Sequence, residues 1–347
     1  MGALDQHVRE IARWHLSPET GTPLWIDLAA EAGVGPEDIQ TFGDLARLPR
    51  FEDAWLRDLP HERLIPRAYA DRPFAVFETG GTTGIPKQRP SFQDHRLDYE
   101  AFSERLDDHA FPPGAAWLMM GPTGPRRLRL TIEHLANHRG GPCYHVDCDP
   151  RWARKLALDG RHDEAAAYTA HVIEQGARLL AHRPIQCLFT TPTLLEALGD
   201  VVDLAQSGIR GVFCGGTSMT AQSLRFLVEE VLGEDITLLP TYGNTLMGLA
   251  VGLPIGADHG FQPRYYAPEP RAVLRVVDPD QPERLVDHGQ WGRVELTTLT
   301  RELFLPRFLE RDEAIRLAPS GPFEHDGVAE VRPLGTGQGA GAVEGVY

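Results

Sequence analysis

A short loop rich in glycine and threonine is the segment of this sequence best suited to chemistry. It runs from Thr79 to Lys87 and contains three glycines, three threonines and one lysine. Glycines let backbone N–H groups approach an anion closely, threonine hydroxyls donate further hydrogen bonds, and the lysine adds positive charge. The pattern favours a phosphate-binding loop over its alternative, a surface turn with a solvated lysine. The predicted contacts are Thr79, Gly80, Gly81, Thr82, Thr83, Gly84 and Lys87.

The middle of the chain alternates between short apolar runs, glycine-rich loops and helical patterns. Strands are predicted at 74–78, 115–120, 143–146, 186–190, 211–214 and 236–239, and helices at 92–106, 128–137, 163–181, 193–198 and 221–232. Such alternation is typical of a parallel or mixed sheet with helices on its faces. Ligands bind at the carboxyl ends of the strands in sheets of this kind. The loops after residues 78, 120, 190, 214 and 239 are therefore the candidate site positions.

The two ends of the chain have a different character. Two helices separated by a turn-rich stretch are predicted within the first 48 residues, and alternating strands at 272–277 and 292–298. The fold class predicted is α/β, with mixed or parallel sheets, flanking helices and a small β subdomain. We expect residues 1–260 to form the core, 261–333 the β subdomain of the same unit, and 334–347 a flexible tail rich in glycine and alanine.

Composition narrows the classes of function. The 347 residues carry 34 Lys plus Arg against 49 Asp plus Glu, a formal net charge of −15. This balance argues against a nucleic-acid-binding protein, which normally presents a basic face. Neither a signal peptide nor an apolar run long enough to span a membrane is recognisable, and the four cysteines form no CxxC pair. We therefore expect a cytoplasmic protein with buried thiols and no metal-ligating residue set.

Four segments, in order along the chain, resemble motifs of the adenylate-forming enzymes, the superfamily of acyl-CoA synthetases, adenylation domains and luciferases. Residues 79–87 resemble their phosphate-binding loop, 214–217 (CGGT) the loop that contacts adenine, 241–245 (TYGNT) the YGxTE motif, and 307–312 (RFLERD) the segment whose aspartate holds the ribose hydroxyls. ETGGTTGIPK and the RxxxRD ending look closest to phenylacetate-CoA ligase relatives, and nearest to the adenylating proteins of phenazine antibiotic biosynthesis. The resemblance implies the large N-terminal-type domain of these enzymes.

The resemblance also implies residue roles in activating a carboxylic acid, which attacks the α-phosphate of ATP and expels pyrophosphate. Lys87 and Thr245 would be the catalytic residues, acting by positioning and by stabilising negative charge. Asp312 would accept both ribose hydroxyls, and Arg307 or Arg311 would add charge nearby. The remaining nucleotide contacts implied are Gly215, Gly216, Thr217, Tyr242, Gly243 and Asn244.

One position departs from the family pattern. The YGxTE motif ends in a glutamate that helps to hold Mg²⁺, but Leu246 stands there, and a leucine cannot ligate a hard cation. Glu78 is an alternative ligand or an ordinary loop acid. The substrate pocket is predicted to suit a planar aromatic acid, although His134 is equally well interpreted as a core histidine. The predicted lining consists of Met120, Gly121, His134, Phe189, Met247 and Gly248.

The resemblance further implies a C-terminal lid domain that supplies a catalytic lysine. No lysine follows Lys155, so we expect that domain to be missing. Three hypotheses remain: an adenylate-forming ligase of secondary metabolism that makes an acyl-adenylate, a ligase completed by a separate partner, and a catalytically impaired protein that binds nucleotide or aryl acid. The cofactors expected are ATP or AMP and Mg²⁺. The partners expected are a carboxylic acid and an acyl-acceptor enzyme or carrier, with a homodimer left open and neither nucleic acid nor membrane.

Overall fold

The structure is a computed structural model that describes residues 2–79, 86–125 and 127–335, and it divides into two compact units. The first comprises residues 1–95, 244–250 and 266–328, and the second 96–243, 251–265 and 329–347. The predicted boundary at residue 260 stays a prediction, since a compact unit need not fold independently. Residues 336–347 of the predicted tail lie outside the described residues, as do the loop residues Gly80, Gly81, Thr82, Thr83 and Gly84.

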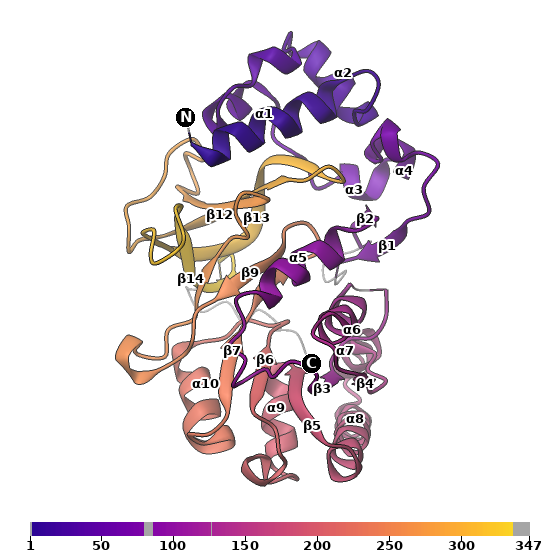
Figure 1. The fold of residues 1–347 in the computed structure, drawn as a ribbon, viewed down its shortest axis with the longest axis vertical. Helices are drawn as coiled ribbons and strands as arrows, with labels where there is room; N and C mark the ends of the chain where they lie inside the picture. Colours follow the sequence, from indigo (N-terminus) through magenta and orange to yellow (C-terminus); the bar gives the residue numbers. More distant parts are fainter. Residues whose placement is uncertain (1, 80–85, 126, 336–347) are drawn as a thin grey trace. The chain divides into compact units, whose positions relative to one another are not determined.

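Five parallel strands form the centre of the second unit (Figure 1). Their order is β4-β3-β5-β6-β7, and every neighbouring pair is parallel. Each coincides with a strand predicted from the sequence to within two residues, because continuous apolar runs are the mark of strands buried on both faces. The bounds are β3 Ala116–Met120, β4 Cys143–His145, β5 Ile185–Thr190, β6 Gly211–Cys214 and β7 Thr237–Pro240.

Helices connect these strands, as parallel crossovers require. Both α6 and α8 pack against β3. The sequence prediction missed α7, a short helix in which three charged residues interrupt the apolar ones, although Asp149 caps it by accepting from the backbone N–H of Arg151 and Trp152. The bounds are α6 Leu128–His138, α7 Pro150–Leu158, α8 His162–His182, α9 Pro192–Gly199, α10 Ala221–Phe226 and the π-helical turn η5 Leu227–Leu232, with the 3₁₀ turns η4 Leu204–Gln206 and η6 Ala257–His259.

The strand predicted at 74–78 is present but belongs to a different sheet from the one expected. It is β1, Ala75–Glu78, and it pairs antiparallel with β2, Gln88–Ser91, in the first unit. Only Phe77 of β1 is buried, so this apolar run does not enter the parallel sheet. The two strands stand on either side of the predicted phosphate loop in the sequence. The base of this loop is closed by the backbone N–H of Thr79, which donates to the carbonyl of Lys87 at 3.0 Å.

An antiparallel sheet and several short helices make up most of the first unit. Strand β12 lies between β11 and β13, and α1 packs on β12 and β13. The sequence predicted β11 and β12 but not β13, where Pro306 and a run of charges interrupt the apolar pattern. The bounds are α1 Ala3–Leu16, α2 Pro23–Glu31, α3 Trp55–Asp58, α4 His61–Leu64, β11 Ala272–Val277, β12 Trp291–Leu299 and β13 Phe304–Leu317, with the 3₁₀ turns η1 Pro36–Asp38, η2 Phe42–Arg47 and η3 Arg67–Tyr69.

Five further elements contain residues of both units: α5 Asp94–Ser103, β8 Tyr242–Asn244, β9 Gly248–Gly252, β10 Arg264–Tyr266 and β14 Gly327–Pro333. No helix within the described residues combines the length and the apolar character needed to cross a membrane.

An aromatic cluster fixes the helices of the first unit to β13. The indole of Trp25 is almost fully buried, and its N–H donates to the carbonyl of Phe304 at 2.7 Å. The Trp25 ring meets the Phe304 ring edge-on at 5.1 Å between centroids, and Phe51 meets Trp55 in the same way. Aromatic rings contribute large buried areas, and edge contacts add to that contribution. This cluster anchors the segment that carries Asp53.

Close backbone approach makes Gly141 a sensitive position in the second unit. A Cβ at Gly141 would stand 1.8 Å from the carbonyl oxygen of Ala115, whereas a Cβ at Gly124 would have no neighbour within 4 Å. We predict that Gly141→Ala lowers the free energy of unfolding by about 1–3 kcal/mol, because backbone must move, and that the control Gly124→Ala changes it little. Urea denaturation followed by circular dichroism measures both. Equal stability of the two variants would contradict this packing.

Candidate functional site

A cluster of charged side chains surrounds Lys87 in the first unit. The ammonium of Lys87 stands 2.8 Å from one carboxylate oxygen of Asp53, while Arg57 and Arg311 contact the other oxygen at 3.0 and 2.6 Å. Lys87 also lies over the ring of Phe308, 5.2 Å from its centroid. Burial opposes ionisation of Asp53, but the hydrogen bond and charge of Lys87 prevail and lower the pKa of Asp53. Lys87 is therefore held by a carboxylate that an anionic ligand would have to compete with.

A second carboxylate, Glu310, is buried beside this cluster. Burial, reinforced by the negative charge of Asp312 and opposed by Lys87, raises the pKa of Glu310 to about 7. The side-chain amide of Asn244 donates to Glu310 at 2.7 Å. The structure thus brings together Lys87, Asn244 and Asp312, which come from three different motifs. Glu310 exchanges its proton near neutral pH, an uncommon property for a carboxyl group.

The segment after Asn244 is fixed by buried polar contacts. The side-chain oxygen of Asn244 accepts from the backbone N–H of Leu246 at 2.9 Å, and Arg89 donates to the carbonyls of Thr245 and Leu246 at 2.8 and 3.1 Å. Arg89 is itself held by Asp94 at 2.7 Å. These contacts fix the backbone that presents the Thr245 hydroxyl. The side chain of Leu246 is 1% exposed, so the position that departs from the family pattern is an ordinary apolar core position.

Two other predicted residues make mainly structural contacts. Arg307 is buried and pairs with Glu283, and its guanidinium approaches Glu295 at 4.0 Å. Glu78 accepts a hydrogen bond from Gln88 at 3.1 Å across the β1–β2 pair. These contacts give Arg307 and Glu78 structural partners, and their roles toward a nucleotide or metal stay predictions.

In the second unit, the loops that follow β5, β6 and β7 meet at the carboxyl edge of the sheet. A Cβ at Gly215 would stand 2.0 Å from the hydroxyl oxygen of Thr241, so only glycine fits there. Gly216 has a φ of +96°, a conformation that glycine adopts without strain, and it faces the methyl group of Thr191. The backbone N–H of Gly215 donates to the carbonyl of Thr190 at 3.1 Å. Three predicted ligand loops of this unit are therefore packed together.

A polar group without a protein partner lies at the same edge. The hydroxyl of Thr190, at the end of β5, is buried and has no hydrogen-bond partner among the described residues. Such groups are uncommon in folded proteins and often face a ligand or water. Among the other predicted adenine contacts, the ring of Tyr242 packs at 5.7 Å from that of Tyr265, while Thr217 is half-buried and Gly243 exposed. The roles of Tyr242, Gly243 and Thr217 toward adenine stay predictions.

The predicted substrate residues fall into different environments. Met120 and Phe189 are buried in the parallel sheet, and a Cβ at Gly121 would stand 3.2 Å from the ring of Phe189. Met247 and Gly248 are also buried, in the first unit. His134, on α6, is hydrogen-bonded to Glu100 at 2.8 Å. The first three residues thus form core packing, and a role of the six in binding an acid stays a prediction.

Sequence reasoning assigned no role to Asp53 or Glu310. Asp53 lies in a short irregular stretch far from Lys87 in the sequence, with no motif around it, so only the fold reveals the pair. Glu310 lies inside the segment that resembles the ribose motif, where acidic residues surround it and an exposed position is the ordinary expectation. Its alternation with the exposed Arg311 on β13 would have been the available signal, had that strand been predicted.

The four cysteines are free thiols, as the absence of a CxxC pair indicated. Burial raises the pKa of Cys143 and of Cys187 to about 12, and raises that of Cys214 as well. Thiols in such surroundings are inert rather than nucleophilic.

Comparison with solved structures relates this fold to that of a CoA ligase. No protein-family model and no curated protein sequence matches the chain. Among solved structures, it is similar to an open conformation of 2-hydroxyisobutyryl-CoA ligase in complex with 2-HIB-AMP and CoA, with a TM-score of 0.68 and 13% identity over 94% of this chain and 72% of that one. The same ligase in its postadenylation state, in complex with 2-HIB-AMP, gives a TM-score of 0.69 and 14% identity over 93% and 65% of the two chains.

These matches establish the fold. The chain shares with this ligase a mixed α/β architecture, with a helix-flanked parallel sheet and an antiparallel sheet. It spans 65% of the length of the ligase in its postadenylation state. Identity at this level supports the fold and leaves the activity to be argued from the residues.

The raised pKa of Glu310 predicts a pH-dependent stability. Its folded value of about 7 exceeds the usual 4.5, so between these values the folded chain binds more protons than the unfolded chain, and stability falls as pH rises. We predict that Glu310→Gln, which keeps an acceptor for Asn244, raises the free energy of unfolding at pH 8 by up to about 3 kcal/mol.

The same substitution should have little or unfavourable effect at pH 4.5, where Glu310 is protonated in the folded chain and about half protonated in the unfolded chain. Chemical denaturation from pH 4.5 to 8 measures the difference. The control Glu324→Gln removes an exposed carboxylate of the same unit and should leave the pH profile unchanged. A Glu310→Gln profile parallel to that of the unchanged protein would rule out the raised pKa.

Proposed function

We propose that this chain binds ATP and activates a carboxylic acid to an acyl-adenylate with release of pyrophosphate. The observation that carries the proposal is the cluster in the first unit, where Lys87, Asn244 and Asp312 from three nucleotide-type motifs lie around one pair of carboxylates. The fold shared with ligases that hold an acyl-adenylate supports it.

The residues of the cluster suit the charge changes of that reaction. Lys87 would leave Asp53 for the departing pyrophosphate, while Arg57 and Arg311 stay with Asp53 and keep it ionised. The Thr245 hydroxyl, on a backbone fixed by Arg89, would donate to the α-phosphate. Asp312 would accept the ribose hydroxyls, a task for which a carboxylate has enough acceptor sites. In the second unit, the 214–217 loop and Tyr242 remain the proposed contacts of adenine.

Magnesium is the metal that this fold family implies, and the residues fit it in part. Leu246 offers no ligand, but Glu310 and Asp312 offer carboxylate oxygens of the kind that Mg²⁺ prefers. Either would complement oxygens from phosphate and water. Bound Mg²⁺ would supply positive charge to the phosphates. Because the pKa of Glu310 is about 7, its carboxyl group would release a proton on ligating a cation.

The class of acid is proposed from the motifs. The resemblance to phenylacetate-CoA ligase relatives and to the phenazine-pathway proteins favours an aromatic acid and a place in secondary metabolism. The similar ligase structures hold 2-HIB-AMP, the adenylate of a small aliphatic hydroxy acid. A substrate screen should therefore contain aromatic and short hydroxy acids. The same proposal includes an enzyme or a carrier that accepts the acyl group. It also includes a homodimer, and a separate partner protein that completes the ligase.

A catalytically impaired nucleotide- or acid-binding protein is the second candidate. The burial of Leu246 favours it, because no carboxylate occupies the motif position that holds the metal in the family. The two candidates differ in acid-dependent exchange between ATP and pyrophosphate, which only the enzyme would catalyse. If the chain binds nucleotide but catalyses no ATP–pyrophosphate exchange with any acid of the screen, the result would favour a binding protein.

We predict acid-dependent ATP–pyrophosphate exchange that Lys87→Ala slows roughly 100-fold, as removal of a charge-stabilising group does in other enzymes. The matched control is Lys155→Ala, which removes the other lysine of the chain, an exposed residue on α7 paired with Asp159. That variant should keep the full rate. An exchange rate unaffected by Lys87→Ala would show that this lysine does not act on the phosphates.

We also predict that Asp312→Asn weakens ATP and AMP binding about tenfold, since charge-assisted hydrogen bonds to the ribose would be lost. Calorimetric titration measures the affinity, and thermal unfolding confirms the fold. The control Asp287→Asn alters an exposed aspartate of the same unit and should bind normally. If the two folded variants bind ATP and AMP with equal affinity, Asp312 does not contact the nucleotide.

A further inference from the structure

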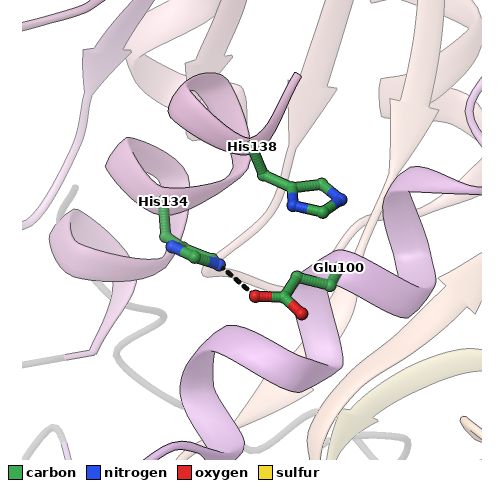
Figure 2. Close-up of side chains that lie close together, drawn as sticks. All are labelled: Glu100, His134 and His138. Atoms are coloured by element: carbon green, nitrogen blue, oxygen red, sulfur yellow. Dashed lines mark hydrogen bonds and ion pairs between the residues drawn. The ribbon is translucent and has the colours of Figure 1, made fainter. Parts of the chain in front are cut away.

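Three side chains that carry metal-ligating atoms converge in the second unit, outside the four nucleotide-type motifs, although one of them, His134, is also among the predicted acid-binding residues. His134 and His138 are four residues apart on α6, so they project from the same face of that helix. Glu100 comes from α5, and Figure 2 shows its carboxylate facing the ring of His134, with the ring of His138 beside them. The ligand atoms of the three lie within 4.8 Å of one another. Two helices distant in sequence thus contribute to one cluster.

The distances fit a small divalent ion after modest adjustment. The Glu100 carboxylate and Nε2 of His134 are already 2.8 Å apart, and ligand atoms around a tetrahedral zinc ion stand roughly 3.4 Å apart when the bonds are about 2.1 Å. His138 is exposed, so rotation of its side chain can close the remaining gap. His134 and Glu100 keep about a quarter and a third of their side-chain surface exposed, which leaves an entry path.

The donor set selects the kind of metal. Two imidazoles and one carboxylate are the ligands of zinc sites that keep open positions for water or substrate. Magnesium and calcium prefer oxygen ligands throughout, so this cluster does not suit the cation that accompanies ATP. We propose that Glu100, His134 and His138 form a binding site for a zinc-type divalent ion that joins α5 to α6.

The surroundings are compatible with water as a further ligand. His138 borders an open surface hollow of about 410 Å³, whose lining includes Glu104 and Asp108. Arg139 holds Asp108 at 2.6 Å, so Asp108 is already neutralised. Glu104, in contrast, is exposed beside His138 and adds negative charge near the ion. The alternative to a metal site is a hydrogen-bonded His134–Glu100 pair with His138 in solvent.

The test is titration of the purified chain, free of any histidine tag, with Zn²⁺ alone and with Mg²⁺ alone. We expect one Zn²⁺ per chain, a rise in melting temperature with Zn²⁺ as ligand linkage requires, and no response to Mg²⁺ at this cluster. His138→Ala and Glu100→Gln should each weaken Zn²⁺ binding at least about tenfold, since loss even of groups behind a ligand has that effect. The control His171→Ala removes an exposed histidine from α8 and should bind Zn²⁺ normally.

His138 is exposed and Glu100→Gln retains an acceptor for His134, so both variants should fold, which circular dichroism verifies. Unchanged Zn²⁺ affinity and stoichiometry in both variants would overturn the proposal, as would the absence of Zn²⁺ binding by the unchanged chain. None of these three residues belongs to the proposed nucleotide site. The outcome of the Zn²⁺ titration therefore does not depend on whether the chain binds ATP.

Discussion

The pairing of Asp53 with Lys87 is the interaction on which the candidate site of the first unit depends. The chain contains only two lysines, and Lys87 is the one placed in a motif. Asp53 binds it together with Arg57 and Arg311, so the cation is oriented before any ligand arrives. A phosphate group must compete with a carboxylate for that lysine. The two arginines offset the cost, because Asp53 stays paired when Lys87 moves away.

Local geometry supports this arrangement from both sides of the loop. The antiparallel β1–β2 pair brings Thr79 and Lys87 together at the ends of the loop, and the aromatic cluster around Trp25 holds the segment that bears Asp53. A short pair of strands is marginal on its own, so its position relies on packing within the first unit. In the second unit, the loops after β6 and β7 are held in place by close packing, since the backbone of Gly215 lies against the side chain of Thr241.

The sequence predicted the parallel sheet well and the first unit less well, for physical reasons. Buried parallel strands are continuous apolar runs, and β3, β5 and β6 have that form. The run at 74–78 has it too, but an apolar run does not state its pairing partner, and β1 pairs with β2 in a two-stranded sheet. β13 was missed because charged residues such as Arg307 and Glu310 occupy buried positions, where their partners come from distant segments.

The residues of the candidate sites also differ in how far the sequence could predict them. Motif residues such as Lys87 and Asp312 could be proposed from local sequence, because their identities and spacing are visible there. Asp53 and the Glu100–His134–His138 cluster could not, since each depends on elements that meet only in the fold. The spacing of His134 and His138 was visible on a predicted helix, but two histidines alone define no site until the carboxylate of a second helix faces them.

The relation between Leu246 and Glu310 bears on whether the chain can be an enzyme. A glutamate at position 246 would lie in a core position that is 1% exposed, where an unpaired charge is strongly unfavourable. Glu310 carries the buried carboxyl group instead, and Asn244, two residues before Leu246, donates to it. Loss of an acid from one motif thus coincides with an acid on β13 that contacts the same motif. A carboxyl group with a pKa of about 7 tolerates burial without a cation and ionises when one binds. In the proposed nucleotide site, Glu310 would thus offer a metal ligand that Leu246 does not, which favours the proposed catalysis over binding alone.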